Sequence, residues 1–209
     1  MSSFETEELR DIYDRFAAGY DRGRTAFDNI AQLQMLAARI PDEADVLDAG
    51  RGSGAPVLKF FADGGHRISG ADISSAMLEL AAERVPSARL MEADSALLDF
   101  ESESFDLITS FYSLFHLEMD AQRKAVAGFH RMLRPGGLAY FTLASERYTE
   151  APVFCGTKVF EGAELPYSHV TPESYHRIFE EAGFIVEQMD HLLIGGEDML
   201  WVLVEKESK

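Results

Sequence analysis

Residues 46–54 read VLDAGRGSG, a short apolar run that leads into three glycines at alternate positions. Residues 55–62, APVLKFFA, continue with a helical pattern, so the segment predicts a strand, a tight bend and a helix. Glycine permits such a bend and lets a ligand approach the main chain, at the point where parallel sheets bind their ligands. The segment therefore predicts a binding loop in an α/β fold.

Short apolar segments alternate with helical ones along the rest of the chain. The strands expected after the glycine segment are residues 67–72, 88–94, 105–111 and 137–143. Successive β-α units predict a doubly wound, largely parallel sheet. Residues 184–194 and 198–207, joined by Gly195 and Gly196, predict an antiparallel hairpin at the end of that sheet.

The domain organisation follows from length and periodicity. A chain of 209 residues that is 46% hydrophobic suits one domain with a single core, residues 1–209. Residues 1–41 predict a helical cap, with helices around 5–16 and 25–40, and residues 145–170 are aromatic-rich without clear periodicity. We expect this second stretch to be a lid or an acceptor-binding insertion. Residues 134–137, RPGG, should form the turn that ends a helix over 121–133.

Charge and cysteine content restrict the partners and the compartment. Asp and Glu number 36 against 19 Lys and Arg, a net charge of −17, which disfavours nucleic acid because a phosphate backbone binds cationic side chains. Cys155 is the only cysteine, the first ten residues are acidic, and no apolar run approaches about 18 residues. We therefore expect a cytoplasmic location and no membrane span.

The spacing of Gly50, Gly52 and Gly54 limits the class of ligand that the loop can bind. Dinucleotide-binding loops have the form G-x-G-x-x-G, and a P-loop ends in Gly-Lys-Ser/Thr, whereas the first lysine here is Lys59. With Arg51 as its only basic residue, the loop has little to neutralise a triphosphate. A cationic or zwitterionic nucleoside fits better.

Two carboxylates end the next two expected strands. Asp72 lies 22 residues after Gly50, where it can accept hydrogen bonds from both hydroxyls of a ribose. Asp94 could accept from an exocyclic adenine amine, with the backbone of Ser95 and Ala96 reading the ring edge. For each carboxylate the alternative is a helix cap.

These segments, with FDLITSFYSLFHL and FHRMLRPGGLAYFTL in the same order, resemble the class I S-adenosylmethionine-dependent methyltransferases over nearly the whole chain. The resemblance implies a Rossmann-like sheet of seven strands whose last strand is antiparallel. It also implies S-adenosylmethionine as cofactor, S-adenosylhomocysteine as product and a small-molecule acceptor. No metal is expected. The implied cofactor contacts are Gly50 and Gly52 at the methionine part, Asp72 at the ribose, Ile73, Met77 and Asp94 at the adenine, and Ser110 and Phe111 along the cleft.

Arg51 departs from the small residue common at its position in this family. Its guanidinium could engage the cofactor carboxylate or an anionic acceptor, or it could lie in solvent. Tyr20 could also bond the cofactor carboxylate, yet Tyr13, Phe16 and Tyr20 are spaced as the packed face of a helix. Both interpretations stay open.

His116 follows the fourth expected strand, at the edge where strand ends face the ligand. It is the leading candidate for a base or an acceptor-positioning residue, with His169 second. The alternative for His116 is a structural histidine bonded to a backbone carbonyl. Competing functions are a cofactor-binding protein without transferase activity, an RNA or protein methyltransferase, and a nicotinamide oxidoreductase.

Overall fold

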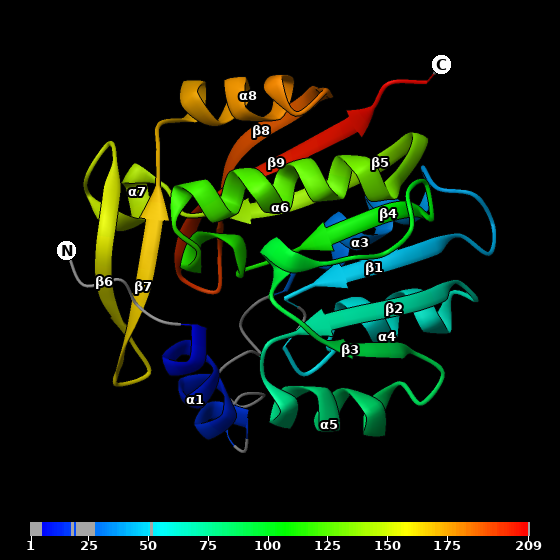
Figure 1. The fold of residues 1–209 in the computed structure, drawn as a ribbon, viewed down its shortest axis with the longest axis horizontal. Helices are drawn as coiled ribbons and strands as arrows, with labels where there is room; N and C mark the ends of the chain where they lie inside the picture. The colour runs from blue at the N-terminus through cyan, green and yellow to red at the C-terminus, as the bar shows by residue number, and fades with distance from the viewer. Residues whose placement is uncertain (1–5, 18, 20–27, 51, 209) are drawn as a thin grey trace.

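The computed structural model describes residues 6–17, 19, 28–50 and 52–208. Its centre is a seven-stranded sheet in the order β3-β2-β1-β4-β5-β9-β8 (Figure 1). The strands are β1 Asp45–Ala49, β2 Arg67–Asp72, β3 Arg89–Glu92, β4 Phe105–Ser110, β5 Leu133–Leu143, β8 Phe184–Ile194 and β9 Glu197–Lys206. β1 to β5 pair in parallel, while β9 is antiparallel to both β5 and β8. The expected doubly wound sheet with an antiparallel last strand is confirmed.

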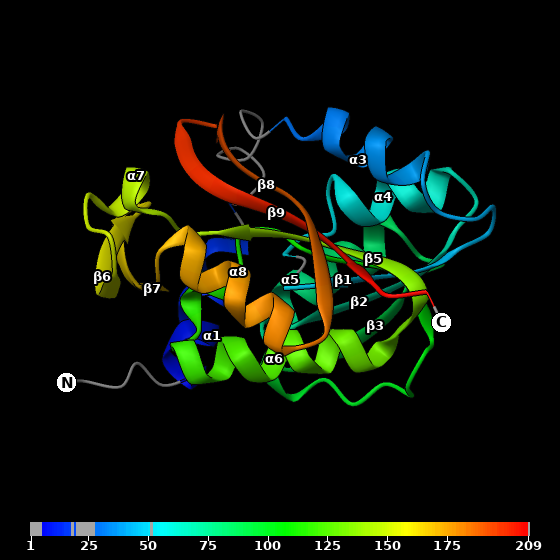
Figure 2. The ribbon, with the colours of Figure 1, turned by 90° about the horizontal axis from the view of Figure 1, so that it is seen from above.

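Helices cover both faces of this sheet (Figure 2). One face is covered by α3 Ile30–Ala37, α4 Val57–Asp63 and α5 Ser75–Arg84, and the other by α6 Met119–Met132 and α8 Pro172–Glu181. Alternation along β1 explains the two layers, because Val46 packs in the first core and Leu47 in the second. None of the helices in the described ranges is long and apolar enough to cross a membrane.

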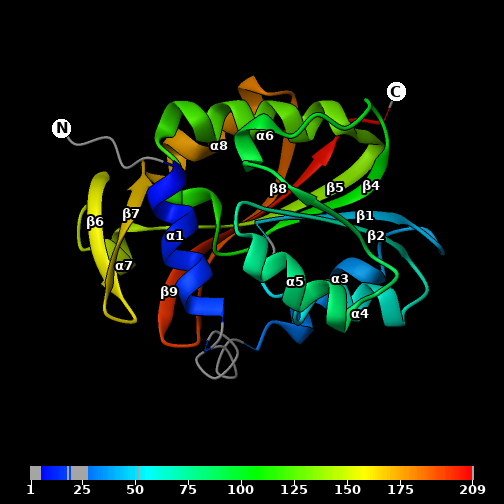
Figure 3. The ribbon, with the colours of Figure 1, turned by 60° about the horizontal axis from the view of Figure 1, so that its bottom comes forward.

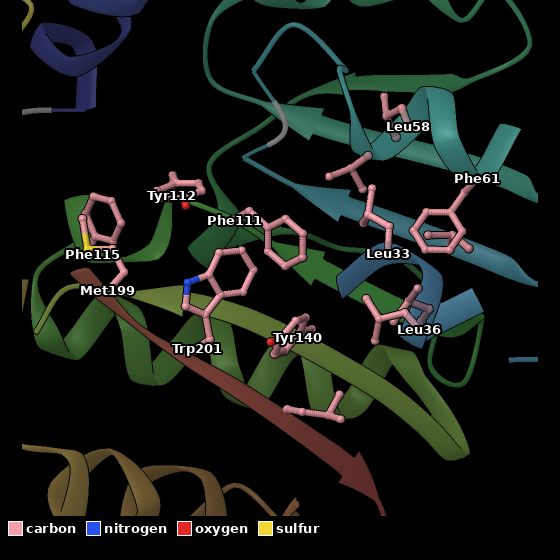
Figure 4. Packing of buried hydrophobic residues seen from close by; sticks show 14 of the residues in the cluster. Leu33, Leu36, Leu58, Phe61, Phe111, Tyr112, Phe115, Tyr140, Met199 and Trp201 are labelled. Carbon is pink, nitrogen blue, oxygen red and sulfur yellow. The ribbon is translucent and has the colours of Figure 1, made fainter. Parts of the chain in front are cut away.

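The core on the α3–α4 side continues through aromatic rings toward the β8–β9 hairpin at the end of the central sheet (Figure 4). Trp201 of β9 lies 5.0 Å from Phe111 and 5.3 Å from Tyr140, measured between ring centroids. All three side chains are buried. This aromatic cluster fixes the segment after β4, which carries several of the expected site residues.

The expected turn at residues 134–137 is different in the structure. β5 already begins at Leu133, and its pairing with β4 shifts from Phe105↔Leu133 to Leu107↔Leu138, so a bulge takes up these residues. The guanidinium of Arg134 holds the bulge, with nitrogens 2.6 Å from a carboxylate oxygen of Asp106 and 2.8 Å from one of Asp45. The helix nevertheless ends at Met132, before the proline.

Residues 145–170 are more regular than the sequence suggested. After the short α7 Glu146–Thr149, the strands β6 Phe154–Phe160 and β7 Ala163–His169 form an antiparallel hairpin that is a second, separate sheet. Figure 3 shows α1 Thr6–Ala17 between this hairpin and α5. The ring of Phe16 on α1 lies 6.3 Å from that of Phe160 on β6. The N-terminal helix and the hairpin therefore pack together at one end of the sheet.

Candidate functional site

The glycine segment makes the expected bend between β1 and α4. Gly50, Gly52 and Gly54 all have positive φ, at 73°, 54° and 79°. A Cβ added at Gly50 would overlap the Oγ and Cβ of Ser113, in the loop after β4. Because β1 and β4 are neighbours where the strand order reverses, this close approach of two loops lies at the switch point of the sheet.

The Asp72 carboxylate is fixed by two backbone groups at the end of β2. One oxygen accepts from the Gly52 N–H at 2.8 Å, and the other accepts from the Ser74 N–H at 2.9 Å. Each carboxylate oxygen can accept a second hydrogen bond, so the buried carboxylate stays suited to a vicinal diol such as that of ribose. The bend and the carboxylate thus form one connected unit.

Asp94 combines the two roles considered from the sequence. Its carboxylate accepts from the Ala96 N–H at 2.8 Å and so caps the short 3-10 helix η1 Ser95–Leu97. Asp94 and Ser95 also line the same cavity as Asp72. The cap directs the carboxylate without removing it from the site.

This cavity has a volume of about 490 Å³ and extends from the glycine bend to the β6–β7 hairpin. Gly50, Gly52, Asp72, Ile73, Asp94 and Ser95 form one side of it. α1 contributes Thr6, Leu9 and Tyr13, the start of α6 contributes Glu118 and Ala121, and the hairpin contributes Cys155, Gly156, Thr157, Pro166, Tyr167 and Ser168. Among the described lining residues the carboxylates Asp72, Asp94 and Glu118 are present and no Lys or Arg is.

Polar contacts hold α1 over the cavity. The Asp14 carboxylate accepts from the Ser74 hydroxyl at 2.6 Å and from the Ala76 N–H at 3.2 Å. Nε of Arg10 donates to the carbonyl of Ile73 at 3.1 Å. All of these bonds end within four residues of Asp72, so α1 is docked on the loop that carries the candidate ribose contact.

His116 lies in the 3-10 helix η2 Leu114–His116, on the cavity wall. Its Nε2 is 2.8 Å from the Tyr13 hydroxyl, and its Nδ1 is 2.7 Å from the Pro166 carbonyl oxygen. A carbonyl only accepts, so Nδ1 carries a proton and Nε2 of the neutral ring accepts from Tyr13. His116 therefore has the backbone bond of a structural histidine and a place in the cavity as well.

The other expected site residues are distributed between the cavity and the core. Ile73 lines the cavity, whereas Met77 is buried against Ala17 and Phe111 is in the aromatic cluster with Trp201. Ala96 supplies the N–H that binds Asp94. Ser110 is buried at the end of β4, and its hydroxyl has no hydrogen-bond partner among the described residues. Tyr20 and Arg51 lie outside the described residues.

His169, the second histidine candidate, is fully buried and is not among the residues lining the cavity. Its Nε2 is 2.6 Å from the Thr149 hydroxyl, so it ties the end of β7 to α7. Burial lowers the pKa of His169 below its ordinary value. These contacts favour a structural role.

The sequence predicted residues 145–170 as a lid or an acceptor-binding insertion, but it identified neither the hairpin nor the hairpin residues that line the cavity. Tyr167 stacks on Phe115 with ring centroids 5.0 Å apart, and Cys155 is exposed on β6, where it pairs with Ser168 of β7. Burial raises the pKa of the Tyr167 hydroxyl, which keeps it protonated. A signal was present on β7, where Ala163, Leu165 and Tyr167 alternate with more polar residues, whereas β6 carries no regular alternation.

Comparisons with known proteins agree with this geometry. Residues 46–137 match the family model described as a methyltransferase domain. A malonyl-[acyl-carrier protein] O-methyltransferase of Enterobacter lignolyticus (strain SCF1) is 34% identical over 142 residues, which are 64% of this chain and 55% of that protein. The chain thus spans little more than half the length of this curated relative.

Two solved structures have the same fold over the whole chain. One is the 1,6-didemethyltoxoflavin-N1-methyltransferase of Burkholderia thailandensis with bound 1,6-didemethyltoxoflavin and S-adenosylhomocysteine. Its TM-score is 0.71 at 21% identity, covering 100% of this chain and 93% of the other. The other is the [4+2]-cyclase SpnF, with a TM-score of 0.77 at 16% identity, covering 100% and 99%. The glycine bend, the strand order and these similarities agree with a methyltransferase domain over residues 46–137 and with a Rossmann-like methyltransferase fold over the whole chain.

Proposed function

We propose that this protein transfers a methyl group from S-adenosylmethionine to a small-molecule acceptor. The observation that carries the proposal is one continuous cavity that is lined by Asp72 and Asp94 and also by Tyr13, His116 and Tyr167. Such a cavity can hold a nucleoside and a second molecule in contact. The bound 1,6-didemethyltoxoflavin and S-adenosylhomocysteine of the Burkholderia enzyme are a pair of this kind.

The donor set fits the adenosyl part of the cofactor. Asp72, oriented by two N–H groups, would accept from the ribose hydroxyls, and Asp94 and Ser95 would meet the adenine edge. Gly50 and Gly52 present bare main chain to the methionine part. Contacts from Ile73, Met77, Ala96, Ser110 and Phe111, and from Tyr20 and Arg51, stay predictions.

When bound, the cofactor supplies a methyl group on a sulfonium, which is already a good electrophile. The protein then has to align the acceptor with that methyl group and exclude water. α1 and the β6–β7 hairpin are placed for this, because both line the cavity and they pack on each other. We therefore propose that residues 1–209 form one domain, in which residues 1–41 are a cap and residues 145–170 are a lid or an acceptor-binding insertion.

Partners and location remain part of the proposal. The acidic cavity lining and the net charge of −17 both weigh against RNA or DNA as acceptor. The single cysteine is compatible with a cytoplasmic location.

Calorimetry with S-adenosylhomocysteine tests whether the protein binds the cofactor. Incubation with methyl-labelled S-adenosylmethionine and a metabolite extract tests whether it transfers the methyl group. Asp72→Ala removes the proposed charged hydrogen bonds to the ribose, which are worth about 1.5–3 kcal/mol of binding free energy. Cofactor binding should therefore weaken by at least about tenfold, the factor that corresponds to about 1.4 kcal/mol. Asp63→Ala is the matched control, since Asp63 is an exposed carboxylate on α4 that pairs with Lys59.

Absence of cofactor binding to the wild type would end the proposal. Binding without any labelled product would support a non-transferring cofactor-binding protein, and label in added RNA would revive the nucleic-acid acceptor.

A further inference from the structure

Three groups from distant parts of the chain form one hydrogen-bonded row on the cavity wall. The Tyr13 hydroxyl of α1 donates to Nε2 of His116, and Nδ1–H of His116 donates to the carbonyl of Pro166 on β7. We propose that Tyr13 and His116 act together to take the proton from the methyl acceptor, and that this acceptor is a neutral phenol or enol. The inference rests on the proposed methyl transfer and specifies its substrate class.

The fixed tautomer is the first argument. The Pro166 carbonyl commits the proton of the neutral ring to Nδ1, so Nε2 is the basic nitrogen and it points at Tyr13. A phenolic oxygen that donates one hydrogen bond can also accept one. Tyr13 can thus receive a proton from the acceptor while it gives its own to His116.

Among the described groups of this wall, His116 is the side chain whose type suits proton transfer near neutral pH. Tyr167 of β7 packs edge-on against its ring at 5.1 Å, and Phe115 lies at 4.6 Å. Burial raises the pKa of Tyr167, so this phenol stays neutral. The other titratable groups of the described wall near this side are the buried phenol Tyr112, and Glu118 at the start of α6 and Cys155 on β6, which are both exposed. Imidazole is the ordinary base near neutral pH.

The lining explains the choice of substrate class. Leu9, Tyr112, Leu117, Pro166 and Tyr167 give flat apolar and aromatic surface, which suits a planar ring. The charged side chains of the described lining are acidic, which favours a neutral acceptor over an anionic one. A neutral phenol or enol matches both properties, and it becomes a good nucleophile once its proton leaves.

The step balances without any further reactant. The acceptor O–H proton moves to the Tyr13 oxygen as the Tyr13 proton moves to Nε2 of His116. The acceptor oxygen forms its bond to the methyl carbon as the S–CH3 bond breaks, and that electron pair stays on sulfur. The imidazolium that results keeps both hydrogen bonds, to Tyr13 and to Pro166, and returns its proton to solvent after product release.

The test uses the full chain saturated with S-adenosylhomocysteine and 4-nitrophenol as the probe, because the phenolate of this compound is coloured. Absorbance is followed against pH. In the wild type the bound phenol should ionise with an apparent pKa about 1 to 3 below that of the free compound, as expected beside an imidazolium. Tyr13→Phe and His116→Gln should each remove most of this difference, and the double variant should remove no more, because the two groups act as one unit.

Matched controls separate this role from general damage. Tyr148→Phe removes a phenol hydroxyl near Tyr167, and His176→Gln changes a histidine exposed on α8; both should behave as wild type. Melting temperatures report folding, and if His116→Gln does not fold, Tyr13→Phe decides alone, since it keeps the ring contact of Tyr13 with Phe16.

The outcomes distinguish the two proposals. If the wild type does not bind S-adenosylhomocysteine in calorimetry, the proposed function fails and this inference fails with it. If it binds S-adenosylhomocysteine but 4-nitrophenol does not bind, or binds with its ionisation unchanged, only this inference is overturned. A pKa difference that survives Tyr13→Phe would overturn it equally.

Discussion

Replacing Gly50 by alanine tests whether the glycine bend is set by the close approach of two loops. Gly50 has a φ of +73°, and a Cβ there would overlap both the Oγ and the Cβ of Ser113. The Cβ of Ser113 cannot be moved by side-chain rotation. The loop after β1 or the loop after β4 must therefore shift, and both loops line the cavity.

The size of the effect follows from two contributions. A left-handed conformation costs a non-glycine residue about 1–2 kcal/mol. Overpacking that forces backbone movement adds about 1–3 kcal/mol. Gly65→Ala isolates the first contribution, because Gly65 has a φ of +84° and a Cβ there would meet no atom within 4 Å. Gly50→Ala should therefore be less stable than Gly65→Ala by about 1–3 kcal/mol.

Urea unfolding of both variants measures this difference, and calorimetry with S-adenosylhomocysteine measures the accompanying loss of binding, which Gly65→Ala should not share. Adding Ser113→Gly to Gly50→Ala leaves only the Ser113 Cα, 3.8 Å from the new Cβ, and should recover most of the overpacking cost. The reasoning is refuted if Gly50→Ala is as stable as Gly65→Ala, or if Ser113→Gly recovers nothing.

Three further predictions concern the same end of the molecule. Asp72→Asn turns an amide N–H toward the N–H of Gly52 or Ser74, so we expect a loss of about 1–3 kcal/mol in unfolding free energy and weaker S-adenosylhomocysteine binding. Unchanged values in both assays would contradict the two backbone contacts assigned to Asp72. Iodoacetamide should alkylate exposed Cys155 and reduce 4-nitrophenol binding while leaving S-adenosylhomocysteine binding intact. Cys155→Ser is the control, and an equal loss of binding of both compounds would argue against the β6–β7 hairpin as the acceptor side. Burial lowers the pKa of His169, so the stability that its neutral form contributes is present above the unfolded pKa of about 6.5 and is lost as the pH falls toward the folded pKa. His169→Gln should therefore flatten the decline in unfolding free energy between about pH 7 and pH 5. A stability curve that stays parallel to that of the wild type would contradict this.

The central sheet could be predicted from the sequence because its strands are short apolar runs between helices with clear end signals. Thr171, for example, caps α8 by accepting from the Ser174 N–H. The bulge at Arg134 could not be predicted, because it depends on Asp45 and Asp106 in two other strands. The β6–β7 hairpin was missed because β6 lacks a regular apolar alternation and the hairpin packs against α1 and η2, outside the central sheet.

The candidate cofactor side could also be read from the sequence, since Gly50, Asp72 and Asp94 follow consecutive strands that end at one edge. The acceptor side could be read only in part, because the sequence named His116 and residues 145–170 but not the contacts between them. Tyr13, His116 and Pro166 come from three separate segments, and no spacing along the chain brings them together. Packing of α1 against the rest of the fold decides that contact, and the sequence left Tyr13 undecided between packing and binding.

The interior position of β9 has a consequence for how the protein is made. β9 pairs with β5 on one side and β8 on the other, so a chain still growing on the ribosome can assemble β1 to β5 but leaves the long edge of β5 open. That edge includes Tyr140 and Phe141, an apolar strand of the kind that pairs with other chains. Until residues 197–206 have been translated, the nascent protein depends on its surroundings, through chaperones or dilution, to avoid joining its neighbours.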